Sequence, residues 1–172
     1  QARRELIRAL TVKRAEPPQV ETGRLIPVPG GSPEVASLDT IFEVMSAAQL
    51  TEELAELEPD FLYVPLDVLA EDPGSIEPFL RRGATVAAVM PRVIHDGELR
   101  GVAALLQKAR TAGVTQALVG NLGHVGIARA AGLDLRGDWS LNLFNSYSLQ
   151  IAAKAGLLSA AVSFELNMEQ IR

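Results

Sequence analysis

Polar residues follow the apolar runs of this sequence at regular points, and they are the residues that could perform chemistry. Several runs rich in Val, Leu and Ala end in a polar cluster, which then opens a helix-like segment. In repeated βα units such clusters gather at the carboxyl ends of parallel strands, where the active sites of these folds lie. The clusters are Glu43 or Ser46, Asp67, Arg92, Asn121 with His124, Asn142 with Asn145, and Ser163 with Glu165.

Arg92, Asn142 and Glu165 form the predicted catalytic group. Arg92 offers a planar fork of donors that suits a carboxylate or a phosphate. Glu165 could act as a general base beside it; alternatively, the two side chains form a structural ion pair that ties adjacent loops together. Asn142 lies in an apolar run that we expect to be a strand. A buried amide needs a polar partner, either from a neighbouring strand or from a ligand.

Five further residues at the same end are predicted to bind substrate: Asn121, His124, Asp138, Asn145 and Ser163. A Ser–His–acid arrangement of Ser163, His124 and Glu165 is an open alternative, although no Gly-x-Ser-x-Gly turn supports it. Asp138 could instead end a turn, and Asn145 could instead cap the helix that follows it.

The composition excludes several kinds of chemistry. The chain has no cysteine, so thiol catalysis, disulfides, iron–sulfur clusters and cysteine-ligated zinc are excluded within it. Two histidines without a His-Glu-x-x-His motif predict no metal site. The acidic run from Glu52 to Asp60 lies along a helical pattern and is typical of a solvated face. We therefore expect no cofactor to be held by this chain alone, and no apolar run is long enough to cross a membrane.

Short apolar runs alternate with helical patterns along most of the chain. Strand starts are spaced by roughly 21 to 31 residues, the period of a βα unit. The predicted strands are Thr40–Met45, Phe61–Pro65, Thr85–Met90, Gln116–Val119, Trp139–Phe144 and Ala160–Val162. The predicted helices are Ala47–Leu57, Gly101–Ala112, Val125–Ala131, Ser146–Ala155 and a segment from Asn167 onward.

Six parallel strands with alternating helices admit two α/β architectures. One is a partial βα barrel, short of the usual eight strands, and the other is an open doubly wound sheet. A doubly wound nucleotide-binding sheet should carry a Gly-rich turn after an early strand, and none is present. The short, regular units therefore favour a TIM-barrel-like partial barrel of about six strands. Its open edges should be covered by other parts of the protein or by a second copy, as in a homo-oligomer.

The charge and the proline content divide the chain into three parts. Residues 1–16 predict a helix belonging to a preceding region, residues 17–38 a Pro- and Gly-rich linker, and residues 39–172 the barrel-like domain, truncated at its C-terminus. Residues 1–14 have a net charge of +4, residues 15–80 of −13 and residues 81–172 of +4. The acidic middle argues against nucleic-acid binding by that face.

Several segments together resemble the collagenase-like peptidases, peptidase family U thirty-two. The resemblance runs from about Thr40 to the end and is most specific in the last third. The segments that carry it are Val89-Met90-Pro91-Arg92, Val119-Gly120-Asn121-Leu122-Gly123, Gly137-Asp138-Trp139-Ser140-Leu141-Asn142, Phe144-Asn145-Ser146, Ser163-Phe164-Glu165-Leu166-Asn167 and Gln170-Ile171, with Arg3-Arg4-Glu5-Leu6 at the start. Phe164 stands where many members have proline.

The resemblance implies a TIM-barrel-like fold and a peptidase, of bacterial origin and cytoplasmic. Relatives are also linked to hydroxylation of RNA bases, and others assist ubiquinone hydroxylation with iron–sulfur clusters. The Gly- and Cys-containing signature of the family lies downstream of Arg172, so the resemblance implies that this fragment is inactive alone. The expected partners are the rest of the parent protein and a peptide or RNA substrate. A third hypothesis is a non-catalytic half-barrel that holds another domain or protein.

Overall fold

The computed structural model describes residues 2–15 and 38–171 of the chain. The chain divides into two units, residues 1–30 and 31–172. Within the described part of the first unit, helix α1 (Ala2–Ala15) is a basic helix, which confirms the predicted N-terminal helix. The predicted linker, apart from Leu38, lies outside the described residues.

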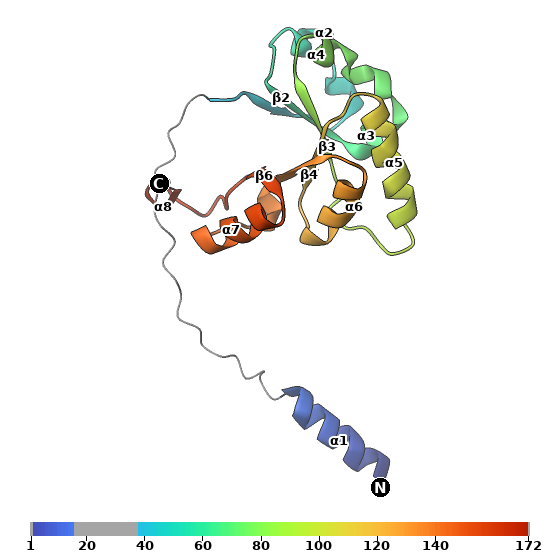
Figure 1. The fold of residues 1–172 in the computed structure, drawn as a ribbon, viewed down its shortest axis with the longest axis vertical. Coiled ribbons are helices and arrows are strands. Elements are labelled where there is room, and N and C mark those ends of the chain that lie inside the picture. The colour runs from blue at the N-terminus through green and yellow to red at the C-terminus, as the bar shows by residue number, and fades with distance from the viewer. Residues whose placement is uncertain (1, 16–37, 172) are drawn as a thin grey trace. The chain divides into compact units, whose positions relative to one another are not determined.

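A single parallel sheet organises the second unit. Its strands are β1 (Ile41–Glu43), β2 (Phe61–Pro65), β3 (Thr85–Val89), β4 (Gln116–Val119), β5 (Asp134–Gly137) and β6 (Leu157–Ala160). They pair in chain order, β1-β2-β3-β4-β5-β6, and every pairing is parallel. Each strand therefore lies beside the strand that follows it in the chain, as in a βα barrel (Figure 1).

Helices connect the strands and cover one face of the sheet. The α-helices of this unit are α2 (Glu52–Ala55), α3 (Leu66–Glu71), α4 (Glu77–Arg81), α5 (Leu99–Thr111), α6 (Val125–Ala130), α7 (Ser146–Lys154) and α8 (Met168–Ile171). Short 3₁₀-helices are η1 (Ala47–Gln49), η2 (Pro73–Ile76), η3 (Leu122–His124) and η4 (Trp139–Leu141). None of the described helices is long and apolar enough to cross a membrane.

Helix α5 shows how the sequence specifies this covering layer. Val102, Leu106 and Ala109 recur every three or four residues and are buried, so one stripe of the helix faces the sheet. The chain then turns at Gly113, whose φ of +102° is readily adopted only by glycine. The helix therefore ends where the next strand must begin.

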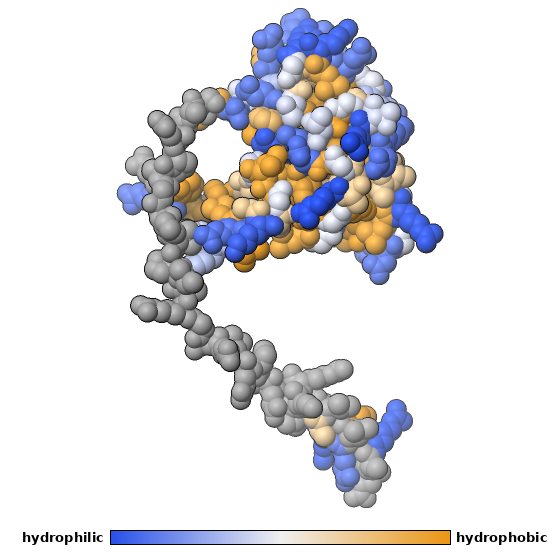
Figure 2. Space-filling model, viewed as in Figure 1, coloured by the Kyte–Doolittle hydropathy of each residue, from blue (hydrophilic) through white to orange (hydrophobic). Residues whose placement is uncertain are grey.

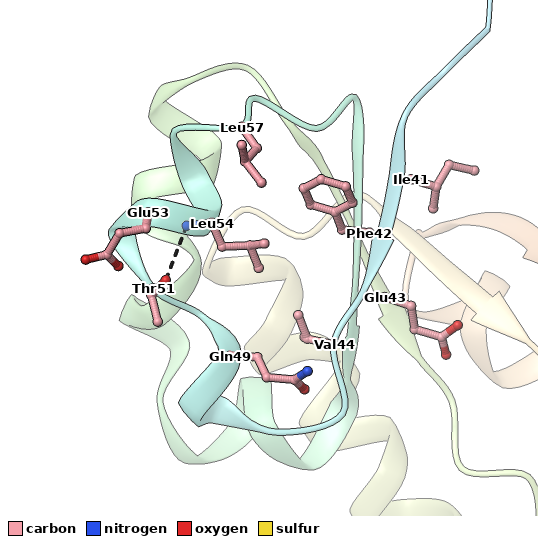
Figure 3. A pocket seen from close by; sticks show the side chains of 9 residues that line it. All are labelled: Ile41, Phe42, Glu43, Val44, Gln49, Thr51, Glu53, Leu54 and Leu57. Carbon is pink, nitrogen blue, oxygen red and sulfur yellow. Dashed lines mark hydrogen bonds between the residues drawn. The ribbon is translucent and has the colours of Figure 1, made fainter.

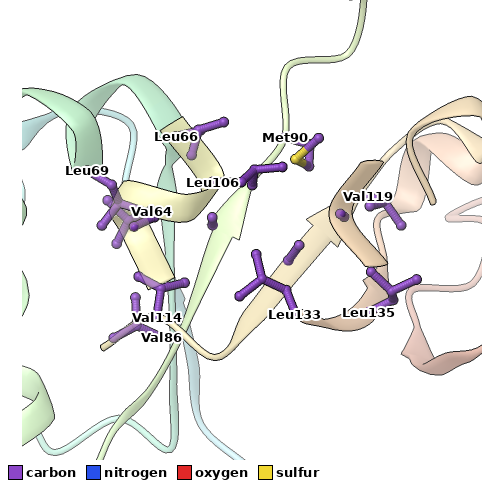
Figure 4. Packing of buried hydrophobic residues seen from close by; sticks show 14 of the residues in the cluster. Val64, Leu66, Leu69, Val86, Met90, Leu106, Val114, Val119, Leu133 and Leu135 are labelled. Atoms are coloured by element: carbon purple, nitrogen blue, oxygen red, sulfur yellow. The ribbon is translucent and has the colours of Figure 1, made fainter. Parts of the chain in front are cut away.

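The main hydrophobic core lies between the helices and the outer face of the sheet. Alternate strand residues such as Leu62, Val64, Val86 and Val119 point into it and are almost completely buried. Figure 4 shows Val64, Val86 and Val119 together with residues from the helices and loops of the same layer, among them Leu69. Because successive strand residues point to opposite faces, the intervening residues are left for the inner face.

The inner face of the sheet is curled around a small interior. Tyr63, Ala87 and Leu118 form a separate buried cluster there. The guanidinium of Arg136 on β5 lies 3.7 Å from the ring centroid of Phe61 on β2. Strands that are not neighbours in the sheet thus face each other across the interior. This curl confirms the predicted partial βα barrel of six strands.

The fifth predicted strand is wrong. Residues 139–141 form η4 instead, and the strand that pairs with β4 is Asp134–Gly137. Asp138 caps η4 by accepting a hydrogen bond from the backbone N–H of Trp139, and Asn142 ends it at a φ of +49°. Only one isolated bridge, Leu143 to Val162, continues the ladder in the residues predicted to be strand.

A later strand and an early helix also differ from the prediction. Strand β6 begins at Leu157 and ends at Ala160, so the predicted strand Ala160–Val162 overlaps it only at its end. The predicted helix Ala47–Leu57 is split into η1 and α2. Thr51 causes this break, because its hydroxyl accepts the N–H of Leu54 and starts a new helix.

Candidate active site at the carboxyl ends of the strands

A cavity of about 330 Å³ opens at the carboxyl ends of the strands. Its polar wall comes from separate units of the barrel: Glu43 ends β1, Asp67 follows β2, Arg92 follows β3 and Asp138 follows β5. The rest of the lining is apolar: Met45, Pro65, Leu66, Val89, Met90, Pro91 and Leu105. This is the end of the sheet at which βα barrels place their catalytic groups.

The carboxylate of Asp138 is fixed by local hydrogen bonds. Its Oδ1 accepts the backbone N–H of Trp139 at 2.7 Å, and its Oδ2 lies 2.8 Å from the hydroxyl of Ser140. The Ser140 hydroxyl also lies 3.0 Å from the carbonyl oxygen of Gly120 on the neighbouring loop. A Cβ at Gly120 would lie 2.3 Å from that hydroxyl oxygen. A glycine at this position therefore gives Ser140 the space to hold Asp138.

Glu43 is a partly buried carboxyl group of the site, and its pKa is raised. Partial burial is the main cause that raises its pKa, and the negative charge of Asp138 raises it further, while Arg92 acts in the opposite direction. No hydrogen bond to the carboxylate of Glu43 is formed among the residues that the structure describes. Glu43 is therefore a carboxyl group that can exchange a proton beside a carboxylate that is held in place.

Arg92 is positioned by an aromatic side chain. Its guanidinium carbon lies 4.5 Å from the centroid of the Trp139 ring, and Trp139 meets Phe164 edge-on at a centroid distance of 5.9 Å. Stacking on the ring leaves the N–H edge of the guanidinium available to a ligand. Within the described part of the chain, Arg92 and Glu165 form no ion pair, so the structural ion pair that the sequence left open as an alternative is not formed.

A second cavity, of about 300 Å³, lies on the inner face and shares Glu43 and Asp138 with the first. Arg136 contributes to it and is held from two sides: its Nε donates to Gln116 at 2.5 Å and its Nη1 to Ser159 at 3.0 Å. The two shared carboxyl groups thus stand between a guanidinium at the rim and another in the interior.

Three of the predicted asparagines have local structural roles. Asn121 caps η3 by accepting the N–H of Gly123 at 2.9 Å, and Asn145 caps α7 by accepting the N–H of Ser148 at 2.9 Å. Asn142 is exposed and left-handed, not a buried amide in a strand. None of the three lines the cavity at the strand ends.

The remaining predicted residues lie elsewhere at this end of the barrel. Ser163 is buried, and its hydroxyl accepts the backbone N–H of Glu165 at 3.3 Å. His124 is buried, its Nδ1 has no partner in the described structure, and burial lowers its pKa. Glu165 is exposed. No hydrogen bond connects the side chains of Ser163, His124 and Glu165 among the described residues, so this structure shows no assembled Ser–His–acid triad.

Of the predicted site residues, the structure brings Arg92 and Asp138 together. It adds Glu43, which the sequence had marked as a strand-end residue without assigning it a role, and the supporting residues Ser140 and Trp139. The sequence itself distinguishes Glu43, since this residue is the only carboxylate within the first predicted strand, Thr40–Met45. The role of Ser140 could not be predicted from the sequence, because it depends on a loop 20 residues away.

No group of three or more potential metal-binding side chains converges within the described ranges.

Two solved structures illustrate the similarity of this chain to known proteins, both at low sequence identity. No family model and no curated protein matches the sequence. One similar solved structure is the tryptophan synthase alpha chain from Legionella pneumophila subsp. pneumophila, at 14% identity and a TM-score of 0.49, over 77% of this chain. This chain spans 64% of the length of that protein. Another is a Coccidioides immitis protein assigned as a deoxyribose-phosphate aldolase, at 16% identity and a TM-score of 0.46, over 95% of this chain and 73% of that one.

Proposed function

We propose that this chain carries an acid–base site for the hydrolysis of peptide bonds, as a collagenase-like peptidase of the cytoplasm. The observation that supports the proposal most strongly is the pairing of Glu43, whose pKa is raised, with the fixed carboxylate of Asp138. Two neighbouring carboxyl groups with different environments can divide the roles of acid and base between them. The peptide substrate is taken from the resemblance of the sequence to the collagenase-like peptidases. The proposal departs from that resemblance in one respect, because it assigns activity to this chain alone through two carboxyl groups and without cysteine.

In this proposal Asp138 accepts a proton from the attacking water, and Glu43 delivers a proton to the departing amine. The water oxygen adds to the carbonyl carbon, the carbon–nitrogen bond breaks, and the two carboxyl groups exchange protons with solvent afterwards. Arg92 faces the same cavity and can stabilise the negative charge that develops on the carbonyl oxygen. Glu165 and Asn142 do not line this cavity, so the acid–base role is assigned to Glu43 and Asp138.

The test is cleavage of fluorescently labelled casein by the 172-residue chain between pH 4 and 9. We expect Glu43→Gln and Asp138→Asn each to reduce the rate by about 100-fold or more, as is usual for loss of a general acid or base. Glu169→Gln is the matched control, because this glutamate is exposed on α8 and outside the cavity. An inactive wild-type chain, or full activity of Glu43→Gln, would refute the proposal. If Glu165→Gln alone lost cleavage activity, the acid–base role would belong to Glu165.

A second candidate function is association with another protein, and a specific observation favours it. Large apolar side chains are exposed at both edges of the sheet, including Ile41 on β1 and Leu158 on β6. Exposed apolar surface of this kind is typical of binding sites. If association is the only function, substitutions at Glu43 and Asp138 will leave every hydrolysis assay unchanged.

A further inference from the structure

An apolar groove lies next to the candidate active site, and Glu43 contributes to the lining of both. It has a volume of about 610 Å³ and lies beside the edge strand β1. Figure 3 shows Phe42 of β1 and Val44, which follows that strand, on one side of it and Leu54 and Leu57 of the α2 region on the other. Glu53 lies at its rim in the same view. We call this feature the β1 groove.

The β1 groove is a gap in the helical layer of the barrel. On the inner strands of the sheet, outward-facing residues such as Leu62, Val86 and Leu135 are at most 2% exposed. At the β1 edge, by contrast, Leu57 is 63% exposed and Phe42 is only partly buried. Apolar surface left at this position would lose its contact with water if another helix packed there, which is favourable.

The chain segment that forms the β1 groove is acidic. Residues 38–60 contain seven carboxylate side chains and no basic residue. The pKa of Glu53 at the rim is lowered, because its own backbone N–H and the hydroxyl of Thr51 donate hydrogen bonds to its carboxylate. The single ion pair of the described residues that involves this segment joins Glu52 to Arg82 at 2.8 Å. The groove therefore combines an apolar floor with a negative border.

We infer that the β1 groove binds an amphipathic helix of a partner protein, with an apolar stripe toward Phe42 and Leu57 and lysine or arginine along its border. A helix suits the position because helices cover the same face of the sheet over the neighbouring strands (Figure 1). The basic border follows from charge complementarity with the acidic rim. A second copy fits less well, since a symmetric contact at this edge would bring the acidic segments 38–60 of both copies together.

The test uses the full 172-residue chain and a fluorescein-labelled helical peptide of 14 residues, with leucines along one stripe and lysines elsewhere. A second peptide carries glutamate at each lysine position. Binding is measured by fluorescence anisotropy at low and high salt. The variant is Leu57→Asp, and the matched control is Leu158→Asp at the opposite edge of the sheet, because these leucines are 63% and 66% exposed. Circular dichroism confirms that each variant is folded.

We expect the lysine peptide to bind, and Leu57→Asp to weaken it by about tenfold or more, as burial of one leucine predicts. Leu158→Asp should bind as the wild type does, and added salt should weaken binding. Equal binding of the glutamate peptide, equal loss in both variants, or no binding of the lysine peptide would overturn the inference. So would a concentration-dependent dimer in sedimentation that Leu57→Asp abolishes, because the occupant would then be a second copy.

Discussion

The two faces of the same sheet differ in what their residues do. On the outer face, Leu62, Val86 and Ala117 are buried beneath the helices and form the main core. On the inner face, residues of the same strands form a small cluster beside the hydrogen-bonded guanidinium of Arg136. Along each strand, one set of alternate residues thus builds the main core, and the other set lines the interior of the curled sheet. The difference predicts unequal responses of the two faces to substitution.

The largest expected difference comes from truncating one leucine on each face. Leu62→Ala should lower the free energy of unfolding by about 2–5 kcal/mol, because Leu62 is completely buried in the main core. Leu118→Ala should lie at the lower end of that range, since few apolar neighbours surround it on the inner face. Urea denaturation monitored by circular dichroism measures both values. Equal losses would show that the interior is packed as tightly as the outer layer.

A smaller effect is expected from adding one carbon atom to the outer face. A Cβ at Gly137 would lie 2.7 Å from Cβ of Ala160 and 2.8 Å from a methyl group of Leu157. Gly137→Ala should therefore reduce stability by about 1–3 kcal/mol through overpacking. Gly126→Ala on α6 is the control, since nothing lies within 4 Å of the new atom and alanine favours a helix. If both substitutions change the free energy of unfolding in the same direction in urea denaturation, overpacking at Gly137 is not the cause.

On the inner face, Arg136→Met should reduce stability by about 1–2 kcal/mol. Methionine keeps most of the apolar contact with Phe61 but removes the hydrogen bonds to Gln116 and Ser159. Arg81→Met serves as the control, because Arg81 is exposed on α4 and should change stability by less than about 0.5 kcal/mol. Thermal unfolding at pH 7 distinguishes the two. A stable Arg136→Met variant would mean that the polar interior does not support the fold.

The smallest effect concerns the pH dependence at the strand ends. The pKa of Glu43 is raised in the folded state, so the folded protein retains this proton to higher pH than the unfolded chain does. Stability should therefore fall as the pH rises through the ordinary range of a glutamate, near 4.5, and into the raised pKa. Glu43→Gln should have a slightly higher melting temperature than the wild type at pH 7. The two proteins should converge below pH 4, and a constant difference would exclude titration of Glu43 as its cause.

The fold could be predicted from the sequence where strands are buried on both faces. Strands β2, β3 and β4 are apolar along most of their length, and their predicted bounds differ from the observed ones by at most one residue. Strand β5 was missed because its inward residues, Asp134 and Arg136, are polar. The run from Trp139 to Phe144 is more apolar, so the sequence pattern predicts the fifth strand there instead. Helices α3 and α4 were missed because both are short.

The candidate site could be predicted only as a set of strand ends. The sequence indicates that polar residues follow the strands, and two of them, Arg92 and Asp138, line the cavity. It does not indicate that β1 and β5 come close together, because that depends on the curl of the sheet. The partnership of Glu43 with Asp138, which are 95 positions apart in the chain, is a property of the tertiary structure alone.

The sequential strand order has a consequence for how such a chain can change. Because each described strand pairs only with its predecessor and its successor, a βα module could be duplicated, exchanged or appended without rethreading the rest of the polypeptide. Sharp turns with positive φ occur at Gly113, Gly132 and Gly156. These turns are positions at which one module could be joined to another. Modular growth of this kind would bring new loops to the cavity at the strand ends while the existing modules keep their own packing.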